Sequence, residues 1–423
     1  MSTRLCLQNT LTGRKEIFKP RRAGQVKLFT CGPSIYNWPH IGNYRTFLYE
    51  DVLQRYLEYL GYAVERLINF TDVEDKAIAE ARRRGVTLEA LTEPVAQRFL
   101  QDCRKLRIKL PEIIPRSSTS VDQAVHLIQN LLESGYAYWH GRDVFYDPLK
   151  FKGFGRLYGL DMSRWPAKKV RFRKDTYPGQ RWNLGDFILW HGRRDPADPF
   201  YWKTAIGEGR PSWNVQDPAM ITQHLGDQID ISCGGVDNLY RHHDYNIAVI
   251  EGVSGKPFAA YWLHGEHVLV EGVKMSKSRG NIVYLSDLLG RGYRPHHLRF
   301  YLIYGHYREK AHLDENRLHL ARGKLDTFRD ILSRLADPGQ GPAESDPAAR
   351  KRIESLRSDF ENAMNDDLDV LAAFDAVYDS AAALAAMQAR GGLSRSDAGR
   401  AADILRRIDS VWRVTALAPG GQE

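Results

Sequence analysis

The stretch that decides the fold runs from residue 26 to residue 43, where the apolar run Val26-Lys-Leu-Phe29 is followed by Pro39-His40-Ile41-Gly42-Asn43. The apolar run predicts a buried strand, and the residues after Asn43 follow a helical pattern. The chain should therefore turn from a strand into a helix near His40. The first backbone N–H groups of a helix are unpaired and favour negative charge, so this turn is a suitable place for phosphate groups.

A second motif, Lys274-Met-Ser-Lys-Ser278, lies far along the chain. Its two lysines can neutralise a polyphosphate from the side opposite His40. Either motif alone is common, and a basic loop of this kind is more often simply solvated. The order of the two motifs and the distance between them make the pair informative.

The first half of the chain alternates strand and helix patterns. A helix after Asn43 is expected to end at Gly61, and a second strand is expected over Ala63–Phe70. Strand, helix and strand in this order predict a doubly wound parallel sheet that binds ligands at the carboxyl ends of its strands. The apolar face of this helix comprises Phe47, Leu48, Val52, Leu53, Tyr56, Leu57 and Leu60.

The composition of the rest of the chain suggests how it divides into domains. We expect the catalytic sheet in two halves, 1–114 and 206–265, separated by an insertion over 115–205 that is rich in aromatic residues, Arg and Pro. Residues 266–310 should hold the lysine motif, and 311–423 should form a helical bundle. Asp346 and Pro347 are suited to cap and start a bundle helix. The apolar stripes of the bundle comprise Leu318, Ala321, Leu325, Phe328, Leu332 and Leu335, then Ile353, Leu356, Phe360 and Met364.

Composition limits the possible partners. The 423 residues carry a formal net charge of +8, which favours polyanionic partners such as ATP. From charge alone, binding and not binding a nucleic acid are equally expected. The four cysteines form no C-x-x-C pair and no disulfide framework. We see no signal-peptide pattern and no uncharged apolar stretch near the roughly 18 residues that span a bilayer. We therefore expect a cytoplasmic monomer without membrane contact.

The two motifs resemble the His-Ile-Gly-His and Lys-Met-Ser-Lys-Ser signatures of class I aminoacyl-tRNA synthetases. Four stretches, one of which overlaps the first motif, narrow this resemblance to one family. From about the N-terminus to residue 415, the chain resembles the cysteinyl-tRNA synthetase family. The resemblance implies a class I Rossmann-type catalytic domain with an inserted domain, followed by an α-helical bundle. The stretches are Phe29-Thr-Cys-Gly-Pro-Ser-Ile-Tyr36, His40-Ile-Gly-Asn-Tyr-Arg45, Asn69-Phe-Thr-Asp-Val-Glu-Asp-Lys76, and Gly234-Gly-Val-Asp237 with His242-His243.

The resemblance also implies an activity, namely the joining of an amino acid to the α-phosphate of ATP, with Mg²⁺, to give an aminoacyl-adenylate. Such a reaction needs aligned reactants and stabilised phosphate charge rather than a covalent intermediate with the protein. By resemblance, the catalytic residues are His40, Asn43, Lys274 and Lys277. The residues that line the adenylate pocket would be Cys31, Gly32, Pro33, Ser34, Gly42, Thr46, Asn69, Thr71, Trp213, Gly235, Asp237 and Val268.

Within that set, Trp213 would lie under the amino-acid side chain, and Gly235, Asp237 and Val268 would hold the ribose and adenine. Plainer roles stay open for some positions. Asn69 and Thr71 could satisfy backbone groups at a strand end, and Trp213 could be ordinary core.

The resemblance breaks at the metal site. The family binds zinc through two cysteines, a histidine and a glutamate; the first cysteine corresponds to Cys31 and the histidine to His242. The second cysteine is replaced by Asp217 and the glutamate by Asn246. A site of Cys31, Asp217 and His242 could still bind zinc, with Cys233 as a replacement sulfur, but the lost ligand charge should weaken it. Zinc and the choice of cysteine as substrate therefore stay open.

A second break concerns the end of the chain. The resemblance implies that the small anticodon-reading domain following the bundle is absent, as in a truncated paralogue, and this layout is also similar to the cysteine ligase of mycothiol biosynthesis. Three functions therefore remain: a ligase that charges the acceptor end of tRNA, a tRNA-independent ligase that uses a small amine or carrier, and a non-catalytic binding module. The complete phosphate-binding motifs argue against the third.

Overall fold

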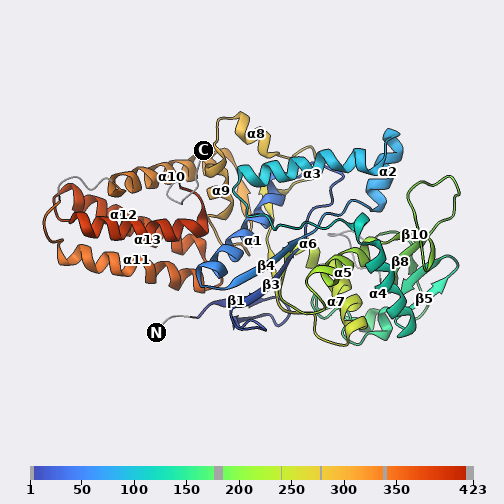
Figure 1. Cartoon of the computed structure of the whole chain (residues 1–423). Helices are drawn as coiled ribbons and strands as arrows, with labels where there is room; N and C mark the ends of the chain where they lie inside the picture. The colour runs from blue at the N-terminus through green and yellow to red at the C-terminus, as the bar shows by residue number, and fades with distance from the viewer. Residues whose placement is uncertain (1–3, 176–183, 240, 277–278, 337–340, 416–423) are drawn as a thin grey trace.

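The computed structural model describes residues 4–175, 184–239, 241–276, 279–336 and 341–415. The molecule is elongated, with a helical bundle at one end, an inserted sheet at the other and a parallel sheet between them (Figure 1). Lys277 and Ser278 of the second motif lie outside the described residues.

The central sheet is parallel and has the strand order β12-β11-β3-β4. Strand β3 lies inside the sheet; β4 is added on one side of it, and β11 and β12 are then added on the other side. The order in which strands are added therefore switches sides between β3 and β11, while all four strands stay parallel. This switch is the place where doubly wound sheets bind ligands, and it confirms the predicted α/β class. The strands are β3 (Gln25–Thr30), β4 (Ala63–Ile68), β11 (Ile229–Gly235) and β12 (Ala259–Gly265).

Helices cover both faces of this sheet. On one face, α1 and α3 bury apolar residues against β3 and β11; on the other, α5 and α7 pack against side chains that include Phe29 and Trp262. The predicted second strand is shorter than expected, because Phe70 takes part only in an isolated bridge to Arg116. The helices around the sheet are α1 (Ile41–Tyr59), α2 (Asp75–Arg84), α3 (Leu88–Lys105), α5 (Trp213–His224), α6 (Val236–Leu239) and α7 (His242–Ser254).

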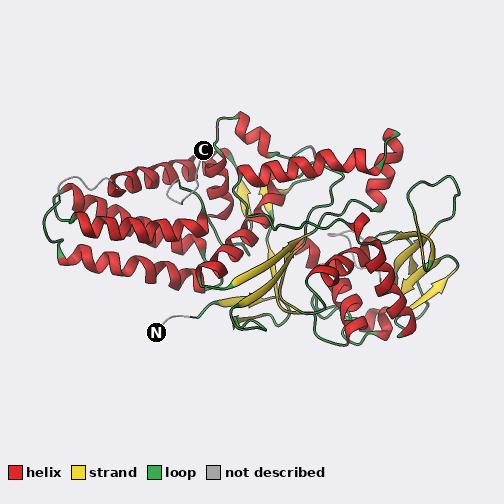
Figure 2. Ribbon diagram, viewed as in Figure 1, coloured by secondary structure: helices red, strands yellow, loops and turns green. Residues whose placement is uncertain are grey.

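The inserted region forms a second, mainly antiparallel sheet with the order β5-β6-β8-β10-β9, and β7 pairs with β8. Figure 2 shows strands of this sheet in yellow at the end of the molecule away from the helical bundle. Because β10 pairs with both β8 and β9, this sheet continues past the expected boundary at residue 205. Its elements are α4 (Val121–Glu133), β5 (Ala137–His140), β6 (Asp143–Tyr146), β7 (Arg171–Phe172), β8 (Asp186–Gly192), β9 (Trp202–Thr204) and β10 (Gly207–Pro211).

Two smaller sheets and two short helices complete the catalytic end. An N-terminal hairpin pairs β1 with β2, and a three-stranded sheet has the order β14-β13-β15. The elements are β1 (Cys6–Asn9), β2 (Arg14–Ile17), β13 (Val268–Val270), β14 (Val273–Lys274), β15 (Ala311–Leu313), α8 (Leu285–Gly290) and α9 (Pro295–Ile303).

The helical bundle buries the predicted apolar stripes, and Asp346 caps α11 by accepting a hydrogen bond from the backbone N–H of Ala348. Among the described helices, α12 alone is long and apolar enough to cross a membrane by length and composition. It packs against α10 and α11 as a core helix of the bundle. The bundle helices are α10 (Glu315–Ala336), α11 (Pro347–Asn365), α12 (Val370–Ala389) and α13 (Arg395–Trp412).

Candidate active site

His40 stands at the N-terminus of α1, as the sequence predicts. Its backbone N–H donates to Asn43 Oδ1 at 2.9 Å, so the Asn43 side chain fixes the turn into the helix. Burial, together with the nearby Lys274, lowers the pKa of His40 to about 4. The imidazole is therefore neutral at neutral pH and can act as an uncharged hydrogen-bond donor.

Gly42 brings the two motifs into contact. A Cβ atom on this residue would lie 2.7 Å from Met275 Cε and 3.1 Å from the His40 ring. Met275 is buried against the first turn of α1, and it neighbours Lys274. The missing side chain at Gly42 thus allows the lysine segment to pack directly on the helix start.

Lys274 reaches a carboxylate at the end of β11. Its Nζ lies 3.0 Å from Asp237 Oδ2, and His267 Nδ1 lies 3.5 Å from Asp237 Oδ1. Burial opposes ionisation of Asp237, but His267 and Lys274 hold its pKa below the usual value. Asp237 is therefore an anionic acceptor at the switch point of the sheet.

Small residues keep the space around this carboxylate open. A Cβ on Gly235 would lie 3.0 Å from Asp237 Oδ1 and 3.7 Å from Thr46 Oγ1. Val268 is buried at the start of β13, close in sequence to His267. Thr46, Gly235 and Asp237 thus come together at this edge of the sheet, and the roles predicted for Gly235, Asp237 and Val268 toward ribose and adenine stay predictions.

The turn after β3 is bound to the turn after β4. Asn69 Oδ1 accepts from the Gly32 N–H at 2.9 Å, and a Cβ on Gly32 would overlap the Asn69 carbonyl oxygen. The Thr71 N–H donates to Pro33 O at 3.2 Å, and Ser34 pairs with Thr71. The two strand ends are therefore held as one surface.

A cluster of Cys31, Asp217 and His242 lies next to this surface. Asp217 Oδ2 is 2.8 Å from His242 Nε2 and 3.5 Å from Cys31 Sγ, and the Sγ to Nε2 distance is 3.8 Å. Asn69 Nδ2 donates to the other Asp217 oxygen at 2.9 Å, so Asn69 connects the cluster to Gly32. The Trp213 ring stacks on His242 with centroids 4.3 Å apart.

The donor set suits a zinc ion. In a tetrahedral zinc site, bond lengths of about 2.0–2.3 Å place the ligand atoms about 3.3–3.8 Å apart. Two of the three distances meet this range, and the Asp217–His242 hydrogen bond would need to open by roughly half an ångström. Burial raises the pKa of the Cys31 thiol well above its usual value and Asp217 adds to the rise, so a cation would be needed to hold the thiolate.

Cys233 and Asn246, the two other candidate positions for the metal site, do not belong to the Cys31–Asp217–His242 cluster. Cys233 is buried in the core that β11 forms with α1, and the ligand group found among the described residues does not include it, so the suggested replacement sulfur is not placed there. Asn246 lies one turn after His242 in α7; it is buried, and neither side-chain amide atom has a hydrogen-bond partner among the described residues.

Sequence reasoning missed the roles of His267 and Met275. His267 precedes Val268 and contacts both charged groups, Asp237 and Lys274. Met275 lies inside the quoted lysine motif but was given no function. Their positions beside residues already selected were the available clues.

Comparison with known proteins identifies the family. Residues 17–323 match the family model described as the class I (C) tRNA synthetase catalytic domain. The chain belongs to this family. A cysteine–tRNA ligase of Chlamydia pneumoniae is 36% identical over 98% of this chain and 87% of the relative. Another, of Lactobacillus delbrueckii subsp. bulgaricus, is 38% identical over 92% of this chain and 82% of the relative.

Solved structures support the fold of this family member. Mycobacterium tuberculosis methionyl-tRNA synthetase in complex with methionyl-adenylate has a TM-score of 0.64 and 15% identity, covering 92% of this chain and 90% of that chain. A likeness at this identity concerns the fold alone. The shared fold covers both the catalytic and the helical parts of the chain.

Proposed function

We propose that this chain activates an amino acid with ATP and then transfers the aminoacyl group to tRNA. The observation that carries the proposal is the contact between the two phosphate-binding motifs, in which Gly42 receives Met275 while His40 and Lys274 face Asp237. The cysteine–tRNA ligases among its relatives make cysteine the first substrate to test.

In the first step, an amino-acid carboxylate oxygen attacks the α-phosphorus of ATP, the bond to the β-phosphate oxygen breaks, and pyrophosphate leaves. His40 and Asn43 would donate hydrogen bonds to the phosphates, and Lys274 and Lys277 would neutralise the leaving group. Asp237 would accept the ribose hydroxyls. Mg²⁺ bound to ATP would screen the phosphate charge, and the reaction would take place in the cytoplasm.

The test is amino-acid-dependent exchange between ATP and pyrophosphate across the twenty amino acids, with and without tRNA. We expect exchange with at least one of them, and Lys277→Ala should lower its rate by roughly two orders of magnitude, the usual effect of losing one transition-state donor. Transfer to tRNA would separate this function from a ligase that uses a small amine. No exchange with any amino acid would favour a binding module.

Cys31, Asp217 and His242 would hold a zinc ion, which would bind and polarise the side chain of the amino acid as a Lewis acid. We expect zinc in the purified protein. Asp217→Ala should reduce the amount of zinc bound per chain at least tenfold, because the set of three ligands loses its anionic oxygen. Elemental analysis measures this directly. Cys233→Ala is the matched control and should keep its zinc, because Cys233 lies in the core; loss of zinc there, or none in the unsubstituted protein, would refute the assignment.

A further inference from the structure

Asp175, in the inserted region just after β7, is a buried carboxylate that contacts three separate elements. Its side chain is fully buried. Oδ1 accepts from the backbone N–H of Trp213 at 3.1 Å and contacts His191 Nε2 at 3.1 Å. Oδ2 accepts from the backbone N–H of Asp75 at 3.1 Å. One side chain therefore connects β8, the start of α5 and the start of α2.

Asp75 returns the contact, since its Oδ2 accepts from the backbone N–H of Asp175 at 2.9 Å. Arg210 contacts the other Asp75 oxygen and lies 3.6 Å from Asp175 Oδ2. Burial opposes ionisation of Asp175, but Arg210 and His191 hold its pKa well below the usual value. Two carboxylates and a histidine could suggest a metal site, but the Arg210 guanidinium already contacts both carboxylates and neutralises one of their two charges. We call Asp75, Asp175, His191 and Arg210 the aspartate clasp.

The two helices joined by the clasp flank the amino-acid end of the candidate site. Trp213, whose N–H donates to Asp175, stacks on His242, and Asp217 follows one turn later in α5. Asp75 follows the turn that contains Asn69, and Asn69 donates to Asp217. The segment after β4 and the start of α5 are thus attached twice, once by the hydrogen bond from Asn69 to Asp217 and once by the clasp.

We propose that Asp175 is a positioning residue that sets the place of Trp213 and Asp217, and so controls amino-acid binding without touching the nucleotide. The inference rests on the proposed function. Asp175 can hold both helix starts because a carboxylate offers two acceptor oxygens. An amide has one acceptor, so Asp175→Asn would set an N–H group against a backbone N–H and would lose the charge opposite Arg210.

The test compares Asp175→Asn with the unsubstituted chain in amino-acid-dependent pyrophosphate exchange. We expect the KM for the amino acid to rise about tenfold, since 1.4 kcal/mol is a factor of ten, and the KM for ATP to stay within twofold. A second measurement is hydrogen–deuterium exchange of the peptides that contain Trp213 and Asp75, which should become faster. His191→Leu removes one contact only and should give a smaller change in the same direction.

Asp195→Asn is the matched control, because Asp195 lies in the loop after β8 and its side chain accepts from the Ala197 N–H rather than from α5. It should leave both KM values and the α5 peptides unchanged. An equal rise of both KM values in Asp175→Asn, or unchanged hydrogen exchange at the start of α5, would overturn the positioning role. No exchange by the unsubstituted chain would instead overturn the proposed function, and hydrogen exchange would still decide whether Asp175 holds α5.

Discussion

Gly42 shows how a single residue can decide whether two distant motifs meet. It lies in the first turn of α1, where its backbone has an ordinary helical conformation. Unusual dihedral angles therefore do not explain why a glycine is needed here. The need for glycine comes from the space that Met275 and the His40 ring occupy in place of a side chain. The requirement for glycine is therefore one of close approach.

Gly42→Ala should lower the rate of pyrophosphate exchange at least tenfold, because the added methyl would push the lysine segment away from the helix start. The KM for ATP should rise with it. Gly323→Ala is the control, since Gly323 lies in α10 with no atom within 4 Å of its Cβ position. That change should keep full activity and stabilise the protein by up to about 1 kcal/mol. Equal activity of the two variants would remove the argument from close approach.

At the scale of a single element, the buried carboxyl group of Asp409 lies at the end of helix α13. Near the end of α13 it accepts from the backbone N–H groups of Val414 and Thr415 at 3.0 and 3.1 Å, while its Oδ2 has no partner among the described residues. Burial raises the pKa of Asp409 to about 6. The folded protein therefore holds this proton more tightly than the unfolded chain, whose aspartate titrates near 3.9.

The sign of the pH dependence follows from this rise. The stabilising contribution of protonated Asp409 is complete below about pH 4 and is lost as the pH rises through 6. The unsubstituted chain should lose this contribution between pH 4 and pH 7, and Asp409→Asn should not. The unfolding free energy of Asp409→Asn, relative to that of the unsubstituted chain, should therefore rise by on the order of 2 kcal/mol from pH 4 to pH 7. Urea unfolding at both values measures it. Asp403→Asn, an exposed position of the same helix, should show no such gain, and an equal gain there would contradict the assignment to Asp409.

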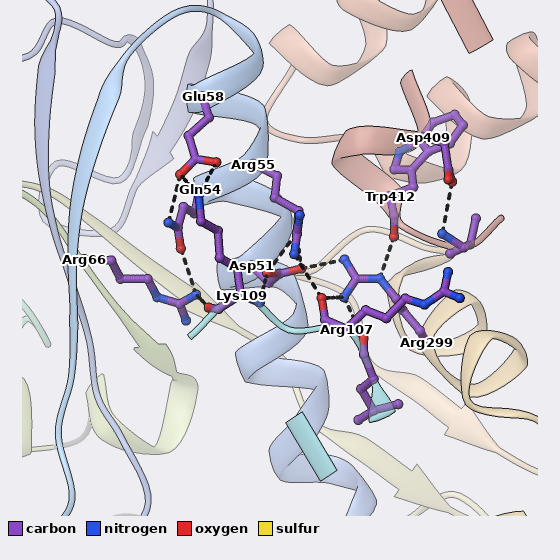
Figure 3. A network of polar contacts seen from close by, with 12 residues as sticks. Asp51, Gln54, Arg55, Glu58, Arg66, Arg107, Lys109, Arg299, Asp409 and Trp412 are labelled. Carbon is purple, nitrogen blue, oxygen red and sulfur yellow. Dashed lines mark hydrogen bonds and ion pairs between the residues drawn. The ribbon is translucent and has the colours of Figure 1, made fainter. Parts of the chain in front are cut away.

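At the scale of the whole molecule, the bundle meets helix α1 of the catalytic domain in a buried polar network around Arg299 (Figure 3). Arg299 of α9 donates to Asp51 of α1 at 2.5 Å, to the backbone oxygen of Trp412 at 2.5 Å and to that of Leu106 at 2.8 Å. Both charged side chains are fully buried. The end of the last bundle helix is thereby joined to the helix that begins at His40.

Arg299→Leu should destabilise the protein by about 3–5 kcal/mol, because it leaves the Asp51 carboxylate buried with weaker compensation and removes a donor from three backbone oxygens, those of Leu106, Arg107 and Trp412. Denaturant unfolding gives the value. Arg317→Leu removes an exposed pair with Asp314 and should cost less than about 1 kcal/mol. Similar losses for both variants would mean that the network does not join the two parts of the molecule.

The sequence by itself determined the local elements of this protein. The apolar run before His40 and the stripes of the bundle are patterns within a few neighbouring residues, and the Asp346 cap bonds to Ala348 two residues on, so periodicity and capping chemistry suffice to predict these elements. The motifs also predicted the class I family. The placing of Asn69 and Thr71 at a strand end followed from the same local pattern, although their contribution to binding stays a prediction.

Only the tertiary structure decided which distant residues meet. The contact of Met275 with Gly42, the bond from Asn69 to Asp217 and the exclusion of Cys233 from the cluster depend on strand order and on which face of β11 each side chain takes. The same is true of the aspartate clasp, whose four members come from four separate segments: the start of α2, the stretch after β7, β8 and β10. Such contacts form because folding buries polar groups that must find partners, and the sequence does not state which partners the topology will bring within reach.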